Sequence, residues 1–525
     1  MAKKLLKAGI VVSLMTLISR ILGLVRDVVI ARIVGADAAA DVYIFANKIP
    51  NFLRRLFAEG AFAQAFIPVL TEVLENEDEK RQKEFIAKVS GTLGLILFIT
   101  AIVGVIASPI ITGLFGFGWF LDYWHGEQDG EKFVLASTLL KITFPYIFFI
   151  SLTGFAGAIL NTMHKFAVSS FTPVLLNISI IACAFFMIPH IEEPAFALAW
   201  GVFIGGAVQL GFQLPFLAKA GVLVKPRWGW QDKYVTKVRT LMIPALFGVS
   251  VSQINLLLDT FIASFLVTGS ISWLYYSDRL LEFPLGLFGI AIATVILPSL
   301  SRNHVTKDAN TFSSTLDWAI RIVSMLGIPA GVALFVLSFP LLMVIFQGGA
   351  FEVDDGYKAS YSLMAYSFGL FSFMLVKIFA PAFYSRQDTK TPVKYGIITM
   401  VVNMVFNIIL AIPFGYIGLA IATSISGSLN AFLLYRRLSF LGVYKITKAT
   451  WFFLFRVILS AIIMCSCITL WNSETDWAAL TFVERLYELG VLIIIGVVSY
   501  FVALILVGMR VKHFVRQDNL SSIDG

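Results

Sequence analysis

The sequence predicts an all-α integral membrane protein with fourteen transmembrane helices in a two-lobed arrangement. Three observations support this prediction. Residues of the types AVILMFWYC make up 58% of the 525-residue chain and charged residues only 14%, whereas soluble domains carry roughly 25% charged residues. Apolar stretches long enough to cross a bilayer follow one another along the whole chain. Two of these stretches resemble two later ones, which indicates an internal repeat.

Polar breaks divide the apolar sequence into the fourteen predicted spans. Several are longer than a bilayer requires, so we expect them to tilt, to kink or to continue beyond the membrane. The predicted spans cover residues 8–34, 41–72, 86–115, 132–160, 168–189, 195–218, 235–266, 272–300, 312–346, 357–384, 393–412, 417–435, 450–471 and 482–508.

The distribution of basic residues predicts the orientation of these spans. Lys and Arg crowd the loops on the side of the N-terminus, whereas the opposite loops hold only Lys132 and Lys358 among several acids. Basic loops stay in the cytoplasm, so both termini are predicted to be cytoplasmic. The net charge is +8, but no basic cluster stands apart from the apolar segments, so no nucleic acid is expected as a partner.

The internal repeat predicts two lobes of the same topology. Residues 56–70 parallel residues 287–300, and, more weakly, residues 158–177 parallel residues 382–403. An even number of spans separates the paired elements, so the repeats run parallel, about an axis along the membrane normal. Transporters commonly have this plan and bind substrate between the halves.

Several arginines lie inside the predicted spans rather than at their ends, and a charge there is costly unless it faces water or a ligand. Arg55 and Arg279 have acids four and three residues away, Glu59 and Glu282, and these two pairs are interpreted as ion pairs on one helix face. The sequence places few acids near the other central arginines on their own helices, and Asp27 is the closest of them. A guanidinium grips phosphate oxygens bidentately, so this set predicts an anionic substrate. The remaining central arginines are Arg20, Arg26 and Arg54.

Five motifs carry a resemblance to a known family. They are SRILGLVRD (19–27), NKIPNFLRRLFAEGAF (47–62), KITFPY (141–146), YYSDRLLEFP (275–284) and FYSRQDTKTP (383–392). Together they resemble the MurJ (MviN) lipid II flippases of bacteria, from the first span to the last. The resemblance implies the multidrug/oligosaccharidyl-lipid/polysaccharide exporter fold, with two six-helix lobes and two extra C-terminal helices.

The resemblance also implies boundaries, a function and a site. It divides the chain into an N-lobe (1–233), a C-lobe (234–440) and a C-terminal helix pair with a cytoplasmic tail (441–525). The implied function is to move lipid II, an undecaprenyl-pyrophosphate-linked peptidoglycan precursor, from the inner to the outer leaflet of the bacterial cytoplasmic membrane by alternating access. Membrane lipids and the peptidoglycan synthesis machinery are the other implied partners. The implied substrate-binding residues are Arg20, Arg26, Asp41, Arg54 and Arg279, with Asp27, Lys48, Arg55, Glu59 and Glu282 in supporting roles.

Two other functions compete with this interpretation. An exporter of another polyprenyl-linked glycan, such as an O-antigen unit, would need the same arginines. An intramembrane enzyme acting on lipid phosphates would need clustered Asp, Glu or His at one membrane face, and the sequence shows none, so no enzymatic activity is predicted.

No nucleotide-binding motif or cofactor site is present in the sequence, so the driving force is expected to be the membrane potential, an ion gradient or consumption of the product. Asp259 is an acid within the seventh span, where it is a functional candidate. Its carboxylate and three amide or hydroxyl groups further along the chain would suit a small hard cation such as Na⁺. Interhelical hydrogen bonding is the competing explanation for those three residues. They are Asn403, Asn407 and Thr423.

Overall fold

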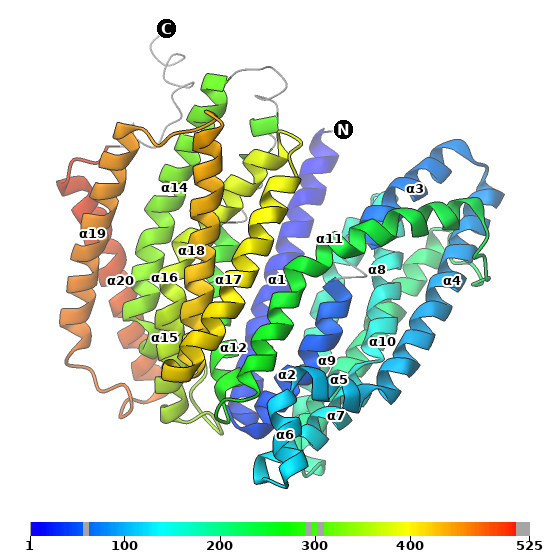
Figure 1. Cartoon of the computed structure of the whole chain (residues 1–525), viewed down its shortest axis with the longest axis horizontal. Helices are drawn as coiled ribbons and strands as arrows, with labels where there is room; N and C mark the ends of the chain where they lie inside the picture. The colour runs from blue at the N-terminus through cyan, green and yellow to red at the C-terminus, as the bar shows by residue number, and fades with distance from the viewer. Residues whose placement is uncertain (1, 56–61, 290–295, 298, 302–308, 511–525) are drawn as a thin grey trace. The chain divides into compact units, whose positions relative to one another are not determined.

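The computed structural model describes residues 2–55, 62–289, 296–297, 299–301 and 309–510 (Figure 1). In these ranges the chain is helical, and its only β-type pairing is one isolated bridge, between Gly348 and Phe351. The predicted all-α class is therefore confirmed. Packing divides the chain into two compact units, Met1–Ser272 (unit 1) and Trp273–Gly525 (unit 2).

Unit 1 contains long helices interrupted by shorter ones. Helix α12 (Ser270–Pro284) begins in the last residues of unit 1 and continues into unit 2. The other helices of unit 1 are α1 (Ala2–Val34), α2 (Ala38–Arg54), α3 (Phe62–Asn76), α4 (Glu79–Ile106), α5 (Ser108–Phe115), α6 (Phe117–His125), η2 (Gln128–Gly130), α7 (Glu131–Thr143), α8 (Tyr146–Thr162), α9 (Phe166–Met187), η3 (Ile188–His190), α10 (Pro194–Lys219) and α11 (Lys233–Ala263).

Unit 2 is a bundle in which long helices lie alongside one another (Figure 1). After α12 it contains η4 (Leu285–Gly289), α14 (Ala309–Val336), α15 (Ser338–Ile345), α16 (Val353–Tyr384), α17 (Lys390–Phe414), α18 (Tyr416–Phe440), α19 (Lys448–Asn472) and α20 (Phe482–Leu506).

Ten helical segments of the described chain are long and apolar enough to cross a membrane. They correspond to the predicted spans that begin at residues 86, 132, 168 and 195 and to the six that begin from residue 312 onward. The four other predicted spans, 8–34, 41–72, 235–266 and 272–300, correspond to α1, α2 with α3, α11 and α12. Multiple membrane crossings are thus supported, and the count of fourteen stays a prediction.

One pair of consecutive helices has the same lengths in the two units. Helices α4 and α14 both contain 28 residues. A single residue, Ala107 in one case and Leu337 in the other, then separates each of them from an eight-residue helix, α5 or α15. This match extends the internal repeat to segments whose sequences show no clear similarity.

The ends of four helices also repeat. The turns that follow α8 and α16 contain His164 and Gln387, both with φ of 61°. Those that follow α10 and α18 contain Gly221 and Gly442, with φ of 72° and 67°. In all four cases the next amide donates to a carbonyl five residues earlier, which is the hydrogen bond of a Schellman cap. The pairing of residues 158–177 with 382–403 therefore has a counterpart in backbone geometry.

Helix α11 packs within unit 1, against α3. Its first turn closes an aromatic core in which Phe66 lies 5.0 Å from Phe155 and 6.0 Å from Phe85 between ring centroids, and Tyr234 lies 5.9 Å from Phe85. The predicted lobe boundary at 233/234 follows the sequence repeat, whereas the boundary set by packing comes after α11. The division into lobes and a C-terminal pair stays a proposal about topology.

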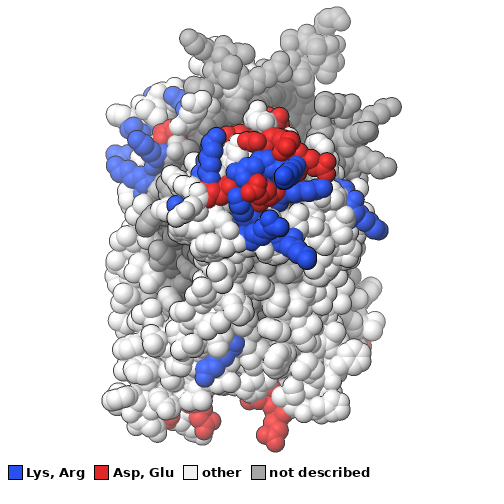
Figure 2. Space-filling view, turned by 90° about the vertical axis from the view of Figure 1, so that its right-hand side faces the viewer, with Lys and Arg blue, Asp and Glu red and all other residues white. Residues whose placement is uncertain are grey.

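Charge is unevenly distributed along the face of the molecule shown in Figure 2. Basic and acidic groups gather at one end, and a broad belt below them is almost free of charge. Such a belt is what a segment in contact with lipid requires, because unpaired charges are costly in hydrocarbon.

Candidate substrate-binding site

Helix α1 presents the first two predicted arginines in different surroundings. Arg20 is exposed. The Arg26 side chain is 12% exposed, and its Nη2 lies 2.7 Å from Oδ1 of Asp27, whose side chain is 1% exposed. Arg26 Nη1 donates to Oδ1 of Asn177 on α9 at 3.0 Å, and Asn177 Nδ2 donates to the Ser19 carbonyl at 3.2 Å. The Arg26 guanidinium is thus fixed from two sides before any ligand arrives.

Asp41 on α2 is buried and faces the turn between α11 and α12. Its Oδ2 accepts from the Gly269 amide at 2.7 Å, and its Oδ1 accepts from the amide and hydroxyl of Ser272 at 2.8 and 2.6 Å. Gly269 has φ of 93°, a conformation that side chains disfavour. In this structure the Asp41 carboxylate satisfies donors of the chain itself and joins α2 to the first turn of α12. Its role in substrate binding stays a prediction.

The end of α2 carries the next group of predicted residues. Lys48 Nζ donates to Thr260 Oγ1 on α11 at 3.1 Å. Arg54 Nε donates to Asn51 Oδ1 at 3.3 Å, three residues earlier on the same helix. Arg55 is exposed, and its predicted partner Glu59 lies outside the described residues.

Arg279 on α12 has the predicted acid beside it. Its Nη1 lies 2.9 Å from Glu282 Oε2, and the two side chains are 34% and 49% exposed. Arg279 Nη2 also donates to the Tyr275 hydroxyl at 3.0 Å, and the guanidinium lies 4.8 Å from the centre of that ring. The carboxylate and the aromatic ring together orient a guanidinium that remains accessible.

Comparison with known proteins identifies the family. The model of the family described as lipid II flippase MurJ matches residues 30–488. A probable lipid II flippase MurJ of Vibrio cholerae is 60% identical over 513 residues, covering 97% of this chain and 98% of the relative. The chain belongs to the lipid II flippase MurJ family.

Other relatives agree with this membership. The lipid II flippase MurJ of Burkholderia cenocepacia is 36% identical over 519 residues, which are 98% of this chain and 99% of that protein. A solved structure of a lipid II flippase MurJ in an inward closed conformation has a TM-score of 0.78 at 30% identity, over 94% of this chain and 98% of its own. A multidrug resistance MATE family transporter has a TM-score of 0.67 at 15% identity, over 83% and 98% of the two chains. That last likeness shows a shared fold.

In this MurJ-family chain the residues of the predicted sodium site belong to both units. Asp259 lies on α11 in unit 1, and the other three lie in unit 2. Asn407 Nδ2 donates to Asn403 Oδ1 at 3.0 Å, and Thr423 Oγ1 donates to the carbonyl four residues earlier at 2.9 Å. Among the described residues there is no group of three His, Cys, Asp or Glu side chains able to hold a metal ion. The Asn407–Asn403 and Thr423 hydrogen bonds each lie within one helix, whereas Asn403 Nδ2 also donates to Ser426 Oγ on α18 at 3.3 Å, as the competing explanation expects. The sodium site stays a prediction.

The residues that position the arginines were not found from the sequence. Asn177 lies 151 positions from Arg26 along the chain, so no local pattern connects the two. Tyr275 is different, because it precedes Arg279 by four residues and faces the same side of the helix. That spacing is a local signal in the sequence for a neutral partner of the guanidinium.

Proposed function

We propose that this chain moves lipid II from the inner to the outer leaflet of the bacterial cytoplasmic membrane, and that Arg20, Arg26, Arg54 and Arg279 hold the pyrophosphate of the substrate on the way. Family membership over most of the chain supports the transport function. The observation that supports the site is that the guanidinium groups of Arg26, Arg54 and Arg279 are each held by neutral or acidic neighbours of the same unit.

The physical task is to carry a pyrophosphate and sugars across roughly 30 Å of hydrocarbon. A guanidinium keeps its charge in an apolar environment and offers five N–H donors in a planar array that matches phosphate oxygens. Arg26 and Arg279 are oriented in advance by Asn177 with Asp27 and by Tyr275 with Glu282. Such orientation lowers the entropy lost when a ligand is bound.

Transport by alternating access would expose the arginines first to one leaflet and then to the other. The basic loops place both termini in the cytoplasm under this proposal, so the headgroup enters on the side of the N-terminus. The membrane potential or a sodium gradient supplies the driving force. Asp41 serves the cycle by holding the turn that links α11 to α12.

The test is transport of labelled lipid II by the purified protein in vesicles, read by a reagent that modifies only outward-facing headgroups. We expect Arg20→Ala, Arg26→Ala and Arg54→Ala each to abolish transport. Arg456→Ala is the matched control. It removes the same charge from the N-terminal half of α19, a position from which we expect the long arginine side chain to reach the membrane interface. Full transport by Arg54→Ala at normal protein levels would overturn the assignment of the site.

A second arm of the test addresses the glycan exporter. The vesicles carry an undecaprenyl pyrophosphate bearing an O-antigen unit in place of lipid II. We expect transport of lipid II and much slower transport of the O-antigen carrier. The reverse preference would favour the other exporter while leaving the role of the arginines intact.

A further inference from the structure

The linker between α10 and α11 lies against α4 as an extended segment, residues 222–231, here called the strap. The Arg227 amide donates to the Ala87 carbonyl at 2.8 Å, and the Gly229 amide donates to Thr92 Oγ1 at 3.0 Å. A Cβ at position 91 would lie 2.3 Å from the Arg227 carbonyl oxygen. Gly91 therefore permits the close seating of the strap on α4.

The sequence of α4 places the strap at the edge of the apolar belt. All charged residues of α4 lie within its first ten positions, and the last of them is Lys88; residues 89–106 carry no charge. The strap contacts α4 at Ala87 and Thr92, on either side of the point where the charged part of the helix ends. Exposed apolar residues such as Leu95 and Phe98 follow on the same helix. The strap thus lies at the level where lipid headgroups meet the acyl chains.

The outward face of the strap carries two stacked tryptophans. The rings of Trp228 and Trp230 are 5.9 Å apart and within 5° of parallel, and they are 56% and 40% exposed. The Arg239 guanidinium lies 4.0 Å from the centre of the Trp230 ring, and its Nη1 donates to the Trp230 carbonyl at 3.4 Å. This stack is ordered by the protein and is still open to the surroundings.

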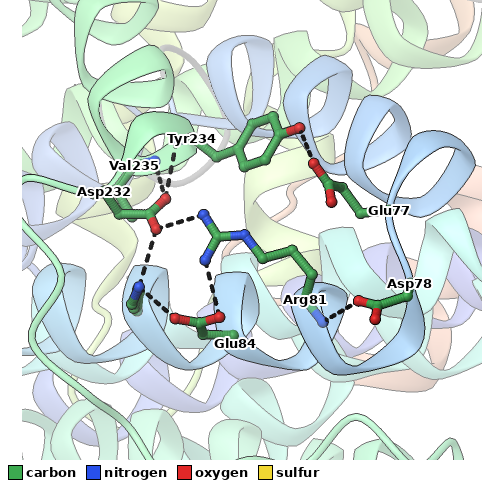
Figure 3. A network of polar contacts seen from close by, with 8 residues as sticks. Glu77, Asp78, Arg81, Glu84, Asp232, Tyr234 and Val235 are labelled. Atoms are coloured by element: carbon green, nitrogen blue, oxygen red, sulfur yellow. Dashed lines mark hydrogen bonds and ion pairs between the residues drawn. The ribbon is translucent and has the colours of Figure 1, made fainter.

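The charge that the strap exposes is positive. Lys225 and Arg227 are exposed, and the strap contains no acid. The acid that follows it, Asp232, is 3% exposed and is occupied by Arg81 at 2.8 Å and Lys88 at 3.1 Å (Figure 3). Arg81 and Lys88 also pair with Glu84 of α4 at 3.0 and 2.5 Å. These ion pairs neutralise the carboxylates beside the strap, which would otherwise repel an anion.

We infer that the strap is a binding surface for the phosphate headgroups of anionic phospholipids in the leaflet on the side of the basic loops. Lys225 and Arg227 attract the phosphate, and the tryptophan pair occupies the interfacial layer, where amphipathic rings are favoured. The equivalent linker of unit 2, residues 443–447, carries lysine but no tryptophan. The surface is therefore a feature of the strap and not of basic linkers in general, and it does not depend on which lipid the protein transports.

The test uses tryptophan quenching by brominated lipids. The full-length protein is placed in nanodiscs of phosphatidylcholine with a minor share of phosphatidylglycerol, and the bromine label is put on one lipid or the other. The signal of the strap is the difference between the parent and Trp228→Phe/Trp230→Phe. We expect brominated phosphatidylglycerol to quench this signal at least about twofold more than its share of the bilayer predicts.

Two charge-neutral variants separate the strap from general charge effects. In Lys225→Gln/Arg227→Gln the preference for phosphatidylglycerol should fall to the bulk share. Lys445→Gln/Lys448→Gln removes the same charge from the unit 2 linker and the first residue of α19, and it should keep the preference. Bulk-share quenching in the parent, an undiminished preference in the strap variant or an equal loss in the control would each overturn the inference.

A measurement on the unmodified protein guards against misfolded variants. Raising the salt from about 0.1 M to about 1 M shortens the screening length from about 10 to about 3 Å. The preference for phosphatidylglycerol should then disappear while total quenching persists. A preference that survives high salt would show that headgroup charge does not cause it.

Discussion

The ion pairs of Asp232 should contribute measurably to stability. Asp232 precedes α11 and accepts from Arg81 and Lys88 of α4, whose side chains are 26% and 24% exposed while that of Asp232 is 3% exposed. Removing one partner from a fully buried pair costs about 3–5 kcal/mol, whereas exposed pairs contribute about 0–1 kcal/mol. For this half-buried arrangement we expect Asp232→Asn to cost about 1–3 kcal/mol of unfolding free energy.

A second substitution separates the charge from the helix cap. Asp232 Oδ1 also accepts from the amides of Tyr234 and Val235 at 2.9 and 3.4 Å, so it caps α11. Asparagine can keep this cap and alanine cannot, so Asp232→Ala should cost about 1 kcal/mol more than Asp232→Asn. Asp78→Ala is the matched control, because Asp78 caps α4 by accepting from the Arg81 amide and its substitution leaves the Asp232 ion pairs intact.

The assay is the midpoint of thermal unfolding of the purified protein in detergent, combined with a double-mutant cycle. Asp232→Asn should lower the midpoint by on the order of a few degrees. After Arg81→Gln the further effect of Asp232→Asn should shrink, because one of its ion pairs is already gone. Effects of the two substitutions that simply add would refute the proposed coupling.

The pH dependence of this contribution has a definite sign. Burial is the largest single influence and acts to raise the pKa of Asp232, but the hydrogen bonds from Arg81, Lys88 and the amides of Tyr234 and Val235 together leave that pKa below its ordinary 3.8. The stabilisation is therefore fully present above that ordinary value and is lost as the pH falls through the lower pKa of the folded state. The difference between the parent and Asp232→Asn should be constant from pH 7 to about pH 5 and should vanish in stronger acid.

Three further predictions concern lipid II transport, lipid II binding and the stability of unit 2. Glu282→Gln should reduce lipid II transport less than Arg279→Ala, because the acid orients the guanidinium and does not bind phosphate; equal loss at normal protein levels would contradict this. Asn177→Ala should weaken lipid II binding and leave protein levels unchanged, because Arg26 loses a neutral partner; unaltered affinity in a binding titration would argue against a role in positioning. Tyr444→Phe removes a hydroxyl that donates to a buried carboxylate on α14 at 2.8 Å, so it should cost about 1–3 kcal/mol and speed trypsin cleavage between α18 and α19.

Composition and motifs predicted the fold class and the family, because both depend on properties spread along the chain. Apolar length identifies membrane helices locally, and the arginine motifs are contiguous. The hydrogen-bond partners of the site residues could not be predicted in the same way. The partners of Asp41 lie 228 and 231 positions away, so the sequence showed an acid among arginines and not the turn that this acid holds. Burial of a carboxylate requires donors, but the sequence does not say which segment supplies them.

The boundary between the two units depends on side-chain packing and differs from the boundary that the sequence repeat predicts. The sequence repeat places α11 at the start of the second lobe, and its span length gives no reason to move it. Its first turn nevertheless packs Tyr234 into the aromatic core of unit 1, and Asp232 adds charged contacts to α4. Side-chain packing across segments far apart in the chain decides such an assignment, and helix periodicity alone does not report it.

The linker after α10 in unit 1 and the linker after α18 in unit 2 are held at similar places in the repeat but by different side chains. In unit 1 the linker supplies an acid, Asp232, and helix α4 supplies the bases Arg81 and Lys88 together with a second acid, Glu84. In unit 2 the helix α14 supplies both charges, Asp317 and Arg321 at 2.6 Å, while Tyr444 and Thr450 donate hydroxyls to Asp317 at 2.8 and 2.6 Å. The backbone turns that precede both linkers are alike. The repeat therefore preserves the path of the chain and not the residues that fasten it, which explains why sequence similarity between the two halves is weak where the structural correspondence is close.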